Sequence, residues 1–433
     1  MHMPPDPDLE IILTRPAGER AGALWQLLDP PQWPIPFKDL PLGSALVGGA
    51  VRDGLLGRLA ARPDLDLVVP VEAIGLAQAL ARRHGGTVVV LDRERSIARL
   101  VIRGWTVDLA RQEGPTLTAD LQRRDYSINA IALSLPWDGE GAVLVDPCAG
   151  LRDLAAGRLR ALSEANLLDD PLRMLRGMRL GGDLALPIDR QSGGWIREHR
   201  ARLTQVAPER VLAELERMAA SPSGHQGLAM ALEYGLLEPW LAADALLLGA
   251  DLPLAALTQN QAQARGLTQE EAHTALPTAR LALLFDAASL GRLQASRRLQ
   301  KKVGSLHHWL KRLQGPGIHG ELERLGEDER LSLQIDLEED LPALLLHLET
   351  SQAATALARW RDPNDPLFHP AAPMDGHTLQ EQLQLPAGPQ LGQLLHYLKL
   401  ERAMGRLPAQ NHDEALIRAK AAGWLQQRAR EVT

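Results

Sequence analysis

Two aspartates separated by one leucine are the first residues whose types and spacing could do chemistry. They open the segment from Asp64 to Val69, where strand alternation puts Asp64 and Asp66 on one face and the leucines on the other. Two like charges side by side are costly unless a cation or solvent lies between them, and paired carboxylates suit Mg²⁺ that bridges phosphate oxygens. For an isolated Asp-x-Asp, a solvated strand edge is the simpler explanation. Asp108, in the segment from Trp105 to Leu109, offers a third carboxylate for a two-metal site.

A pair of glycines, Gly48 and Gly49, follows the apolar residues Leu46 and Val47 and precedes a segment with helical spacing. Glycines at a strand-to-helix junction let backbone N–H groups approach an anion, and a helix N-terminus favours negative charge. A phosphate is therefore a candidate ligand. Taken alone, the pair is better explained by a plain turn.

A third motif combines arginines with polar residues ahead of an apolar run. Arg123, Arg124 and Asp125 stand together, and Asn129 follows. The arginines could bind phosphates, while Asp125 and Asn129 could contact ribose hydroxyls. An ordinary charged helix start would explain the same residues.

A fourth motif begins at Asp170, which is a good helix N-cap, with Pro171 as the first helical residue. Arg173, Arg176 and Arg179 then recur every three residues and drift by only roughly 60° per step around the helix. They therefore share one face. Such a stripe is usually solvated, but solvated stripes normally alternate in sign, and this one is uniformly positive.

These motifs need a sheet and a helical region to bring them together. Short β-branched runs, separated by glycines and helical stretches, predict strands at residues 45–47, 67–69, 87–90, 100–102 and 106–107. After about Arg158 this pattern ends, and leucine and alanine at helical spacing continue to the C-terminus. The sequence therefore predicts an α/β head followed by helical domains. The proline-rich residues 1–43 predict an irregular leader with one helix at about 21–28.

Composition limits the remaining possibilities. The chain has 433 residues, 45% of them apolar and 23% charged, which predicts two to four domains with ample cores. Aromatic residues make up only 3%, so a platform of many stacked aromatics is not expected. The single cysteine, Cys148, and the absence of a signal-like or membrane-spanning apolar run predict a reducing, cytoplasmic location without disulfides. Because the net charge is -7, a local basic face would have to attract any nucleic acid.

The succession of the four motifs resembles that of one enzyme family. Bacterial tRNA nucleotidyltransferases, which build the 3′-terminal CCA, and the related poly(A) polymerases carry Gly-Gly-x-Val-Arg-Asp, Asp-x-Asp, Arg-Arg-Asp-x-x-x-Asn-Ala and Asp-Asp-Pro-x-Arg-x-x-Arg-x-x-Arg in this order. The resemblance is dense from Ala45 to Ala220 and fades over residues 221–365. It returns at Met374 to Gly376 and at residues 388–395.

The resemblance implies an α+β fold, with a polymerase-β-like nucleotidyltransferase head (a mixed sheet with helices) followed by an all-helical neck, body and tail. On this basis we place the leader at 1–43, the head at 44–160, the base-recognising neck at 161–222, the body at 223–365 and the tRNA-binding tail at 366–433. The HD phosphohydrolase domain of some relatives is not expected, because His412 and Asp413 stand alone and are interpreted as a helix cap.

Carried onto matching positions, the resemblance also implies the site residues. The catalytic residues, which would bind the expected cofactor Mg²⁺, are Asp64, Asp66 and Asp108. The nucleotide-binding residues are Gly48, Gly49, Arg52, Arg124, Asp125, Asn129, Asp170, Arg173, Arg176 and Arg179. Among them, Gly49 and Arg52 would hold the triphosphate, and Asp170 and Arg173 would read the base. One position departs from the family: Asp169 stands where many relatives have glutamate.

The implied activity is template-independent addition or repair of the 3′-terminal CCA of tRNA from CTP and ATP, with release of pyrophosphate. The expected partners are the tRNA 3′ end, CTP and ATP, with no membrane and no obligatory protein partner. A poly(A) polymerase is an alternative. A non-catalytic RNA-binding paralogue is another, although the three retained carboxylates argue against it.

A CC-adding or A-adding specialist of the same family is a further alternative. Only Gln112 to Ala119 lie between the Asp108 segment and the Arg123 motif, where relatives that add the full CCA often carry a longer flexible segment. That segment is associated with switching the pocket from C to A, and Pro115 stiffens the short one found here. We nevertheless expect a compact head that completes CCA over a specialist.

Overall fold

The computed structural model describes residues 11–136, 141–245, 253–315, 320–386, 388–408 and 414–431. The chain divides into two compact units. The first comprises Met1–Val206 with Glu233–Leu236, and the second comprises Ala207–Leu232 with Leu237–Thr433. The first unit contains the predicted leader, the head and most of the neck, together with every predicted site residue.

A seven-stranded mixed sheet forms the centre of the first unit, with the strand order β3-β4-β5-β2-β1-β6-β7. Its strands are β1 Ala45–Val47, β2 Leu65–Val69, β3 Thr87–Asp92, β4 Ile97–Ile102, β5 Trp105–Arg111, β6 Ala132–Ser134 and β7 Val143–Val145. Only β2 and β5 pair in parallel; the other neighbours are antiparallel. The predicted mixed sheet is confirmed, and five of these strands contain the predicted runs.

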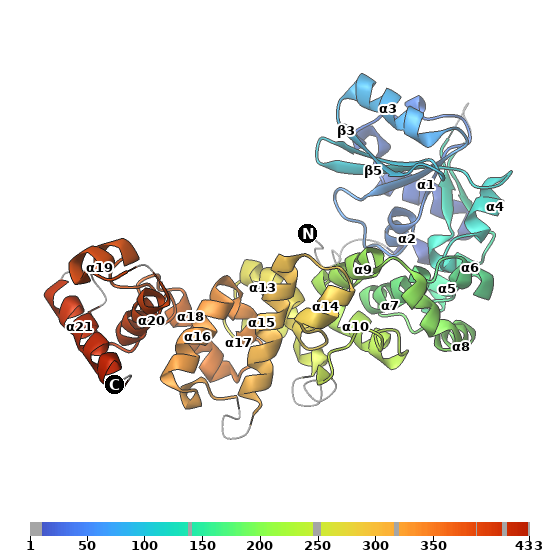
Figure 1. Ribbon diagram of the computed structural model, residues 1–433. Coiled ribbons are helices and arrows are strands. Elements are labelled where there is room, and N and C mark those ends of the chain that lie inside the picture. Colours follow the sequence, from blue (N-terminus) through green and yellow to red (C-terminus); the bar gives the residue numbers. More distant parts are fainter. Residues whose placement is uncertain are drawn as a thin grey trace. The chain divides into compact units, whose positions relative to one another are not determined.

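Alternate residues of β3, β4 and β5 face a helix layer. Helix α3 (Ala73–His84) packs on these three strands, as Figure 1 shows, and Ala98, Leu100 and Leu109 are fully buried. The residues between them are partly or fully exposed, since among the described residues of the first unit only α3 packs extensively on these three strands. The period-two pattern of burial is the one expected for a half-buried sheet.

Among the residues that the structure describes, the first unit contains seven further α-helices. They are α1 Ala17–Leu27, α2 Gly49–Leu55, α4 Leu117–Gln122, α5 Gly150–Ala155, α6 Glu164–Asp169, α7 Leu172–Leu184 and α8 Arg190–His199. The predicted leader packs against this unit through α1, which contacts α2 and β7. A side chain at Gly54 would collide with Leu24, so glycine permits the close approach of α1 and α2. Leu24, Trp33 and Ile35 are buried, which makes this segment part of the core.

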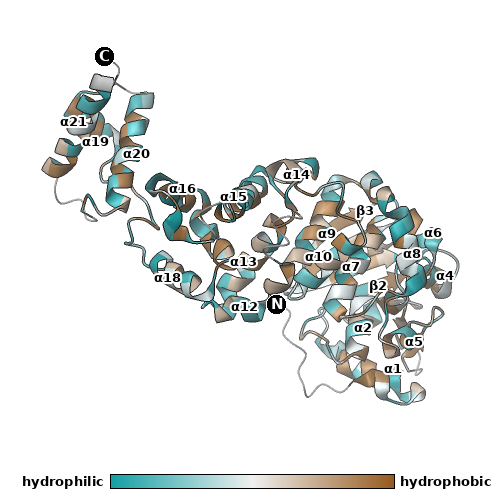
Figure 2. Ribbon diagram, turned by 90° about the horizontal axis from the view of Figure 1, so that it is seen from below, coloured by the Kyte–Doolittle hydropathy of each residue, from teal (hydrophilic) through white to brown (hydrophobic). Residues whose placement is uncertain are grey.

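The described residues of the second unit form helices and no strands, as predicted. The helices are α9 Pro208–Ala220, α10 Gly224–Glu233, α12 Gln259–Ala264, α13 Gln269–Ala282, α14 Ala287–Arg292, α15 Arg297–Leu313, α16 Glu327–Leu337, α17 Leu341–Leu345, α18 Thr350–Trp360, α19 Gly376–Leu383, α20 Pro389–Ala403 and α21 Glu414–Glu431. Figure 2 shows hydrophilic and hydrophobic residues side by side along α15 and α16, as amphipathic helices require.

A fully buried arginine ties several of these helices together. Arg280 on α13 donates to the carbonyl oxygens of Ala219 and Ser221, each at 2.6 Å, at the end of α9, and to that of Leu257 at 2.8 Å. It thereby supplies donors to carbonyls that the α9 helix end leaves unsatisfied. No helix among the described residues is long and apolar enough to cross a membrane. The predicted cap at His412 and Asp413 lies outside the described residues.

Candidate active site

All the predicted site residues line one cleft of the first unit, with a volume of about 1070 Å³. The sequence distributes them over more than a hundred positions, from the β1–α2 turn to α7, and the fold brings them to one place. They are Gly48, Gly49, Arg52, Asp64, Asp66, Asp108, Arg124, Asp125, Asn129, Asp170, Arg173, Arg176 and Arg179. Asp169 also lines the cleft.

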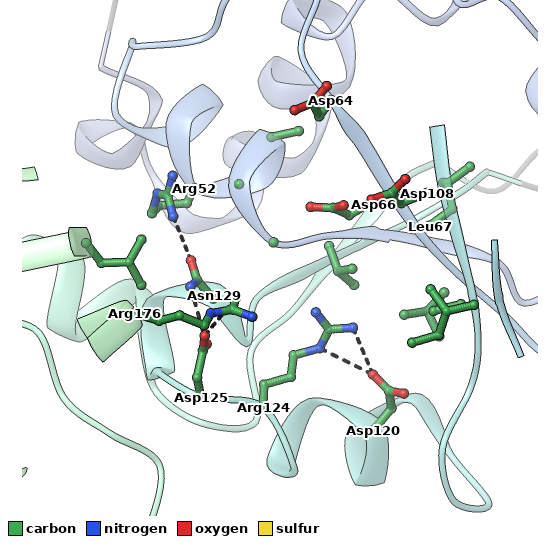
Figure 3. A pocket seen from close by; sticks show the side chains of 18 of the residues that line it. Arg52, Asp64, Asp66, Leu67, Asp108, Asp120, Arg124, Asp125, Asn129 and Arg176 are labelled. Atoms are coloured by element: carbon green, nitrogen blue, oxygen red, sulfur yellow. Dashed lines mark hydrogen bonds and ion pairs between the residues drawn. The ribbon is translucent and has the colours of Figure 1, made fainter. Parts of the chain in front are cut away.

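Two of the three predicted carboxylates form a close pair. Asp66 and Asp108 are direct partners across the parallel strands β2 and β5, and Figure 3 shows both side chains on the same side of the sheet. Burial, reinforced by the Asp108 charge, raises the pKa of Asp66 to about 6. A like-charge pair with a raised pKa is a site that a cation would stabilise, and carboxylate oxygens are ligands that Mg²⁺ prefers.

Asp64 lies apart from this pair. It is exposed and directly precedes β2, which begins at Leu65, and Figure 3 shows it set back from Asp66 and Asp108. Among the described residues, only Glu164, Glu198 and His199 bring three possible metal-ligating atoms within 4.8 Å of one another. The three aspartates therefore share the cleft without forming a closed cluster of ligands.

The glycine turn lies against the carboxylate pair. Gly48 has a φ of 73°, a backbone conformation that favours glycine, and a Cβ added there would lie 2.8 Å from Oδ2 of Asp66. The helix α2 that follows starts at Gly49 and carries Arg52 into the cleft. The double glycine thus allows the chain to turn beside Asp66 without a side chain in the way.

Polar side chains hold Arg52 and Asp125 in place. Arg52 donates to both oxygens of Asp53, at 2.8 and 2.9 Å, and to Oδ1 of Asn129 at 2.7 Å. Asp125 accepts from the Tyr126 backbone N–H at 2.8 Å and lies 3.0 Å from Nη2 of Arg176. Although burial opposes ionisation, Arg176 and these hydrogen bonds hold the pKa of Asp125 below its usual range. Figure 3 shows the resulting group of charged side chains facing the cleft.

The short segment from Gln112 to Ala119 is held by hydrogen bonds at its first two residues and continues into α4 at Leu117. The backbone N–H of Gln112 donates to the Val69 carbonyl at 2.8 Å, and that of Glu113 donates to Oδ1 of Asp120 at 2.9 Å. Thr116 caps α4. Asp120 also accepts from Nη2 of Arg124 at 3.0 Å, so the same carboxylate fixes the segment and a predicted nucleotide-binding arginine.

Helix α7 joins the head through a buried tyrosine. The Tyr126 hydroxyl donates to the Arg173 carbonyl at 3.0 Å, and any side chain at Gly177 would collide with the Tyr126 ring. The helix begins at Leu172, one residue later than predicted, with Pro171 at the cap position. Asp170 instead accepts from the Leu172 N–H at 3.3 Å.

Asp170 and Arg173, the pair predicted to read the base, both lie at the start of this helix. Arg173 donates from Nη1 to the Asn166 carbonyl at 2.9 Å, which fixes its guanidinium beside the cleft. Burial lowers the pKa of Arg173, against the opposing charges of Asp125 and Asp170. The Arg173 guanidinium therefore sits in a partly dehydrated environment.

Sequence reasoning missed one arginine in direct contact with the carboxylates. Arg99 on β4 donates from Nε and Nη2 to the two oxygens of Asp108, each at 2.8 Å. Its pairing with Asp108 is fixed by the antiparallel register of β4 and β5. A single sequence does not give the register of paired strands, and Arg99 belongs to no motif that would identify it. Arg58, Arg62, Arg95 and Arg111 also line the cleft and were not predicted.

Comparison with known proteins shows to which family the chain belongs. The family model described as "Poly A polymerase head domain" matches residues 44–160, and that described as "Probable RNA and SrmB- binding site of polymerase A" matches residues 186–243. Over 414 residues the chain is 35% identical to a Synechocystis sp. protein named CC-adding tRNA nucleotidyltransferase, which covers 90% of this chain and 96% of that protein. The chain belongs to the bacterial tRNA nucleotidyltransferase family. It is an enzyme of the nucleotidyltransferase class, and the resemblance stated from the motifs is confirmed.

Other relatives differ in the nucleotide that their names specify. A Deinococcus radiodurans protein named A-adding tRNA nucleotidyltransferase is 40% identical over 208 residues, which is 47% of this chain and 46% of that protein. A solved structure of the Bacillus stearothermophilus CCA-adding enzyme in complex with CTP covers 96% of this chain and 100% of its own, with a TM-score of 0.67 and 20% identity. This likeness confirms the fold of the family. The names of the relatives do not agree on one product.

Proposed function

We propose that this enzyme adds the two cytidylates of the tRNA 3′ end from CTP and stops before the terminal adenylate, in place of the full CCA addition expected from the sequence. The observation that carries this proposal is the short, doubly anchored segment from Gln112 to Ala119. Its first two residues are held by Val69 and Asp120, its last three belong to α4, and Asp120 at the same time holds Arg124. A segment fixed in this way has little freedom to reshape the pocket for a purine. The name of the Synechocystis relative, which covers most of the chain, points to the same product.

In the proposed reaction, the 3′-hydroxyl of the RNA attacks the α-phosphorus of CTP. The new bond joins O3′ to this phosphorus, the hydroxyl proton passes to solvent, and the bond from the α-phosphorus to the bridging oxygen breaks to release pyrophosphate. Asp66 and Asp108 would hold Mg²⁺, and Asp64, which lines the same cleft, would complete the set of carboxylates. When bound, Mg²⁺ would neutralise charge that develops on the phosphate oxygens.

The arginines of the cleft would bind and orient the triphosphate. Arg52 is fixed by Asp53 and Asn129, and Arg124 by Asp120, so both guanidinium groups are oriented before a nucleotide arrives. Preorganised charges cost little reorganisation during the reaction. Asp125 and Asn129 would contact the ribose, since their hydrogen bond of 3.3 Å leaves acceptor and donor capacity for hydroxyl groups.

Asp170 and Arg173 would select the base. Cytosine and adenine present an amino donor beside a ring-nitrogen acceptor, whereas uracil and guanine present a carbonyl beside an N–H. A carboxylate acceptor next to a guanidinium donor therefore fits the first two and leaves unpaired groups against the others. Arg176 and Arg179, one and two turns further along α7, would support this site.

The test is a single-turnover assay with three transcripts of one tRNA, ending before the CCA, after CC and after CCA, each supplied with one nucleotide at a time. We expect two cytidylates on the first transcript with CTP and no adenylate on the second with ATP. Addition of A to the CC transcript as fast as C addition to the shorter one would overturn the CC-only proposal.

The same assay distinguishes CC addition from poly(A) synthesis and from RNA binding without catalysis. Repeated adenylation of an unrelated RNA 3′ end, with no use of CTP, would identify a poly(A) polymerase. Binding of all transcripts with no transfer of any nucleotide would identify a non-catalytic RNA-binding protein. An Asp66→Asn variant serves as the catalytic blank, because its side chain keeps the shape of aspartate and loses the charge that would bind the metal.

A further inference from the structure

One side of β3 and β4 presents apolar side chains to solvent. Val89 on β3 is 47% exposed and Val101 on β4 is 43% exposed, while their neighbours Ala98 and Leu100 are buried under α3. Because side chains alternate across a strand, the two valines lie on the face opposite to α3. A sheet face that leaves valines in water is a candidate contact surface.

This face leads directly to the carboxylate pair. Val89 pairs with Arg99 across β3 and β4, Arg99 pairs with Asp108 across β4 and β5, and Asp108 pairs with Asp66 across β5 and β2. Directly paired residues of adjacent strands project on the same side of a sheet. One row of side chains therefore runs from the edge strand to the proposed catalytic carboxylates.

Two arginines supply positive charge along this row. Arg99 uses two of the five N–H donors of its guanidinium for Asp108, and its side chain is 43% exposed. The guanidinium can therefore hold Asp108 and still donate to a second anion. Arg62 lies beside the turn between β4 and β5, because a Cβ at Gly104 would lie 3.1 Å from its Nη1.

The proposed nucleotide site lies on the other side of the carboxylates. Arg52 follows β1, and Arg124 precedes β6, whereas β4 and β3 lie beyond β5 in the opposite direction along the sheet. Transfer of a nucleotidyl group requires the attacking and leaving oxygens to lie roughly in line through the phosphorus. With the triphosphate on the β1 and β6 side, the attacking hydroxyl arrives from the β4 side.

We propose that Val89, Arg99, Val101 and Arg62, here called the acceptor platform, bind the unpaired 3′ end of the RNA acceptor. This inference rests on the proposed function and adds to it the surface that holds the second substrate. The last bases lie on the two valines, the terminal ribose extends along the row towards Asp108, and the backbone phosphates contact the two arginines. Arg99 acts as a positioning residue, because it links the acceptor phosphate to Asp108. A single-stranded RNA end supplies both the apolar base faces and the negative charges that this surface complements.

The platform is tested by placing negative charge on it. Val89→Asp and Val101→Asp are compared with Val143→Asp, a matched control at a 57% exposed valine of β7, on the opposite edge of the same sheet. The RNA probe is a fluorescent acceptor-stem minihelix that ends before the CCA, and its dissociation constant is measured by anisotropy without CTP. We expect on the order of tenfold weaker RNA binding for each platform variant and no change for the control. The KM for CTP should change by less than about twofold.

A second variant keeps the proposal testable if an aspartate disturbs the strand. Arg99→Gln removes one proposed phosphate contact, so the slope of log Kd against log salt concentration should fall by about 0.7. A merely structural role of Arg99 would weaken binding without changing this slope. Circular dichroism and melting of each variant confirm that it is folded.

Equal RNA binding by the platform variants and the control would overturn the proposal, and so would an unchanged salt slope in Arg99→Gln. Sedimentation that shows a dimer of the wild type and monomers of the platform variants would assign the face to a second copy of the chain instead. Since the binding assay contains no CTP, it gives its result whether or not the enzyme adds CC. Failure of the platform and failure of the proposed function are therefore distinguishable.

Discussion

At the scale of single residues, the Asp66 and Asp108 pair predicts a link between metal binding and stability. Burial and the neighbouring charge raise the pKa of Asp66 to about 6, so its ionised form is disfavoured in the folded, metal-free protein. At pH 8, in EDTA, we expect Asp66→Asn to raise the free energy of unfolding by on the order of 1 kcal/mol. The same variant should lose transfer activity by on the order of a hundredfold or more.

Thermal melts with and without Mg²⁺ check this prediction. Mg²⁺ should raise the melting temperature of the wild type and leave that of Asp66→Asn unchanged, because the variant lacks the paired charge. Asp169→Asn, at an exposed carboxylate of the same cleft, is the matched control and should respond to Mg²⁺ like the wild type. An equal response of Asp66→Asn and the wild type would contradict the proposed metal site.

Base selection is a second property of single residues. Asp170→Ala removes the only proposed acceptor for the amino group of cytosine, so discrimination against UTP should fall by on the order of tenfold or more. The ratio of kcat/KM for CTP to that for UTP measures this effect. Asp169→Ala, at the neighbouring carboxylate, should leave the ratio of kcat/KM for CTP to that for UTP unchanged. If Asp170→Ala only slows transfer and keeps its preference for CTP, Asp170 does not read the base.

The candidate site was predictable from the sequence to the extent that its residues belong to contiguous motifs. Each of the four motifs places its polar residues within a few positions, and all of them line the same cleft. Arg99 was not predictable in this way, because its contact with Asp108 depends on the register of two strands. The roles assigned to these side chains stay predictions until the variants are measured.

At the scale of elements, β1 to β5 were predictable and β6 and β7 were not. The apolar and β-branched runs within β1 to β5 mark strands on their own, whereas the three-residue strands β6 and β7 were not recognised. Their pairing with the rest of the sheet, β6 with β1 and β7 with β6, is a tertiary interaction that local sequence does not encode. The N-terminal segment shows the same limit, since its prolines suggest an irregular leader while its buried side chains pack into the first unit.

A histidine of the second unit gives the helices a predictable response to acid. Burial lowers the pKa of His347 to about 3, and its Nε2 has no hydrogen-bond partner among the described residues. In the unfolded chain, the His347 imidazole takes up a proton when the pH falls below its ordinary pKa of 6.5, whereas the folded chain keeps this histidine neutral. Stability is therefore complete above pH 6.5 and is lost as the pH falls towards 3.

His347→Gln should remove the loss of stability that protonation of His347 causes at acid pH. Between pH 7 and pH 5, the wild type should lose on the order of 1 to 2 kcal/mol more unfolding free energy than the variant. Urea unfolding at the two pH values measures the difference. His308→Gln, at an exposed histidine of α15, is the control and should keep the pH dependence of the wild type. A His347→Gln profile parallel to that of the wild type would show that this group is not the source.

At the scale of the whole molecule, charge is distributed unevenly. The chain carries a net charge of -7, yet the cleft gathers arginines from every part of the head and from α7. Several of them are already oriented by carboxylates, such as Arg52 by Asp53 and Arg124 by Asp120. Ten arginines and nine carboxylates line the cleft, so Mg²⁺ bound to the carboxylates would leave the arginines to attract a polyanion despite the overall negative charge.

The division into two compact units predicts how the whole chain unfolds. Contacts cluster within each unit, so heat should unfold the units in separate transitions, and a single two-state description should fail.

The predicted site residues all belong to the first unit. A ligand stabilises only the fold that binds it, by about 2.7 kcal/mol at a hundredfold excess over Kd. Calorimetry of the full chain should therefore show that CTP with Mg²⁺ raises one transition by roughly 5–10 °C. The other transition should stay in place with CTP and shift with pH, less so in His347→Gln. A single transition that CTP moves as a whole would mean that the two units unfold together.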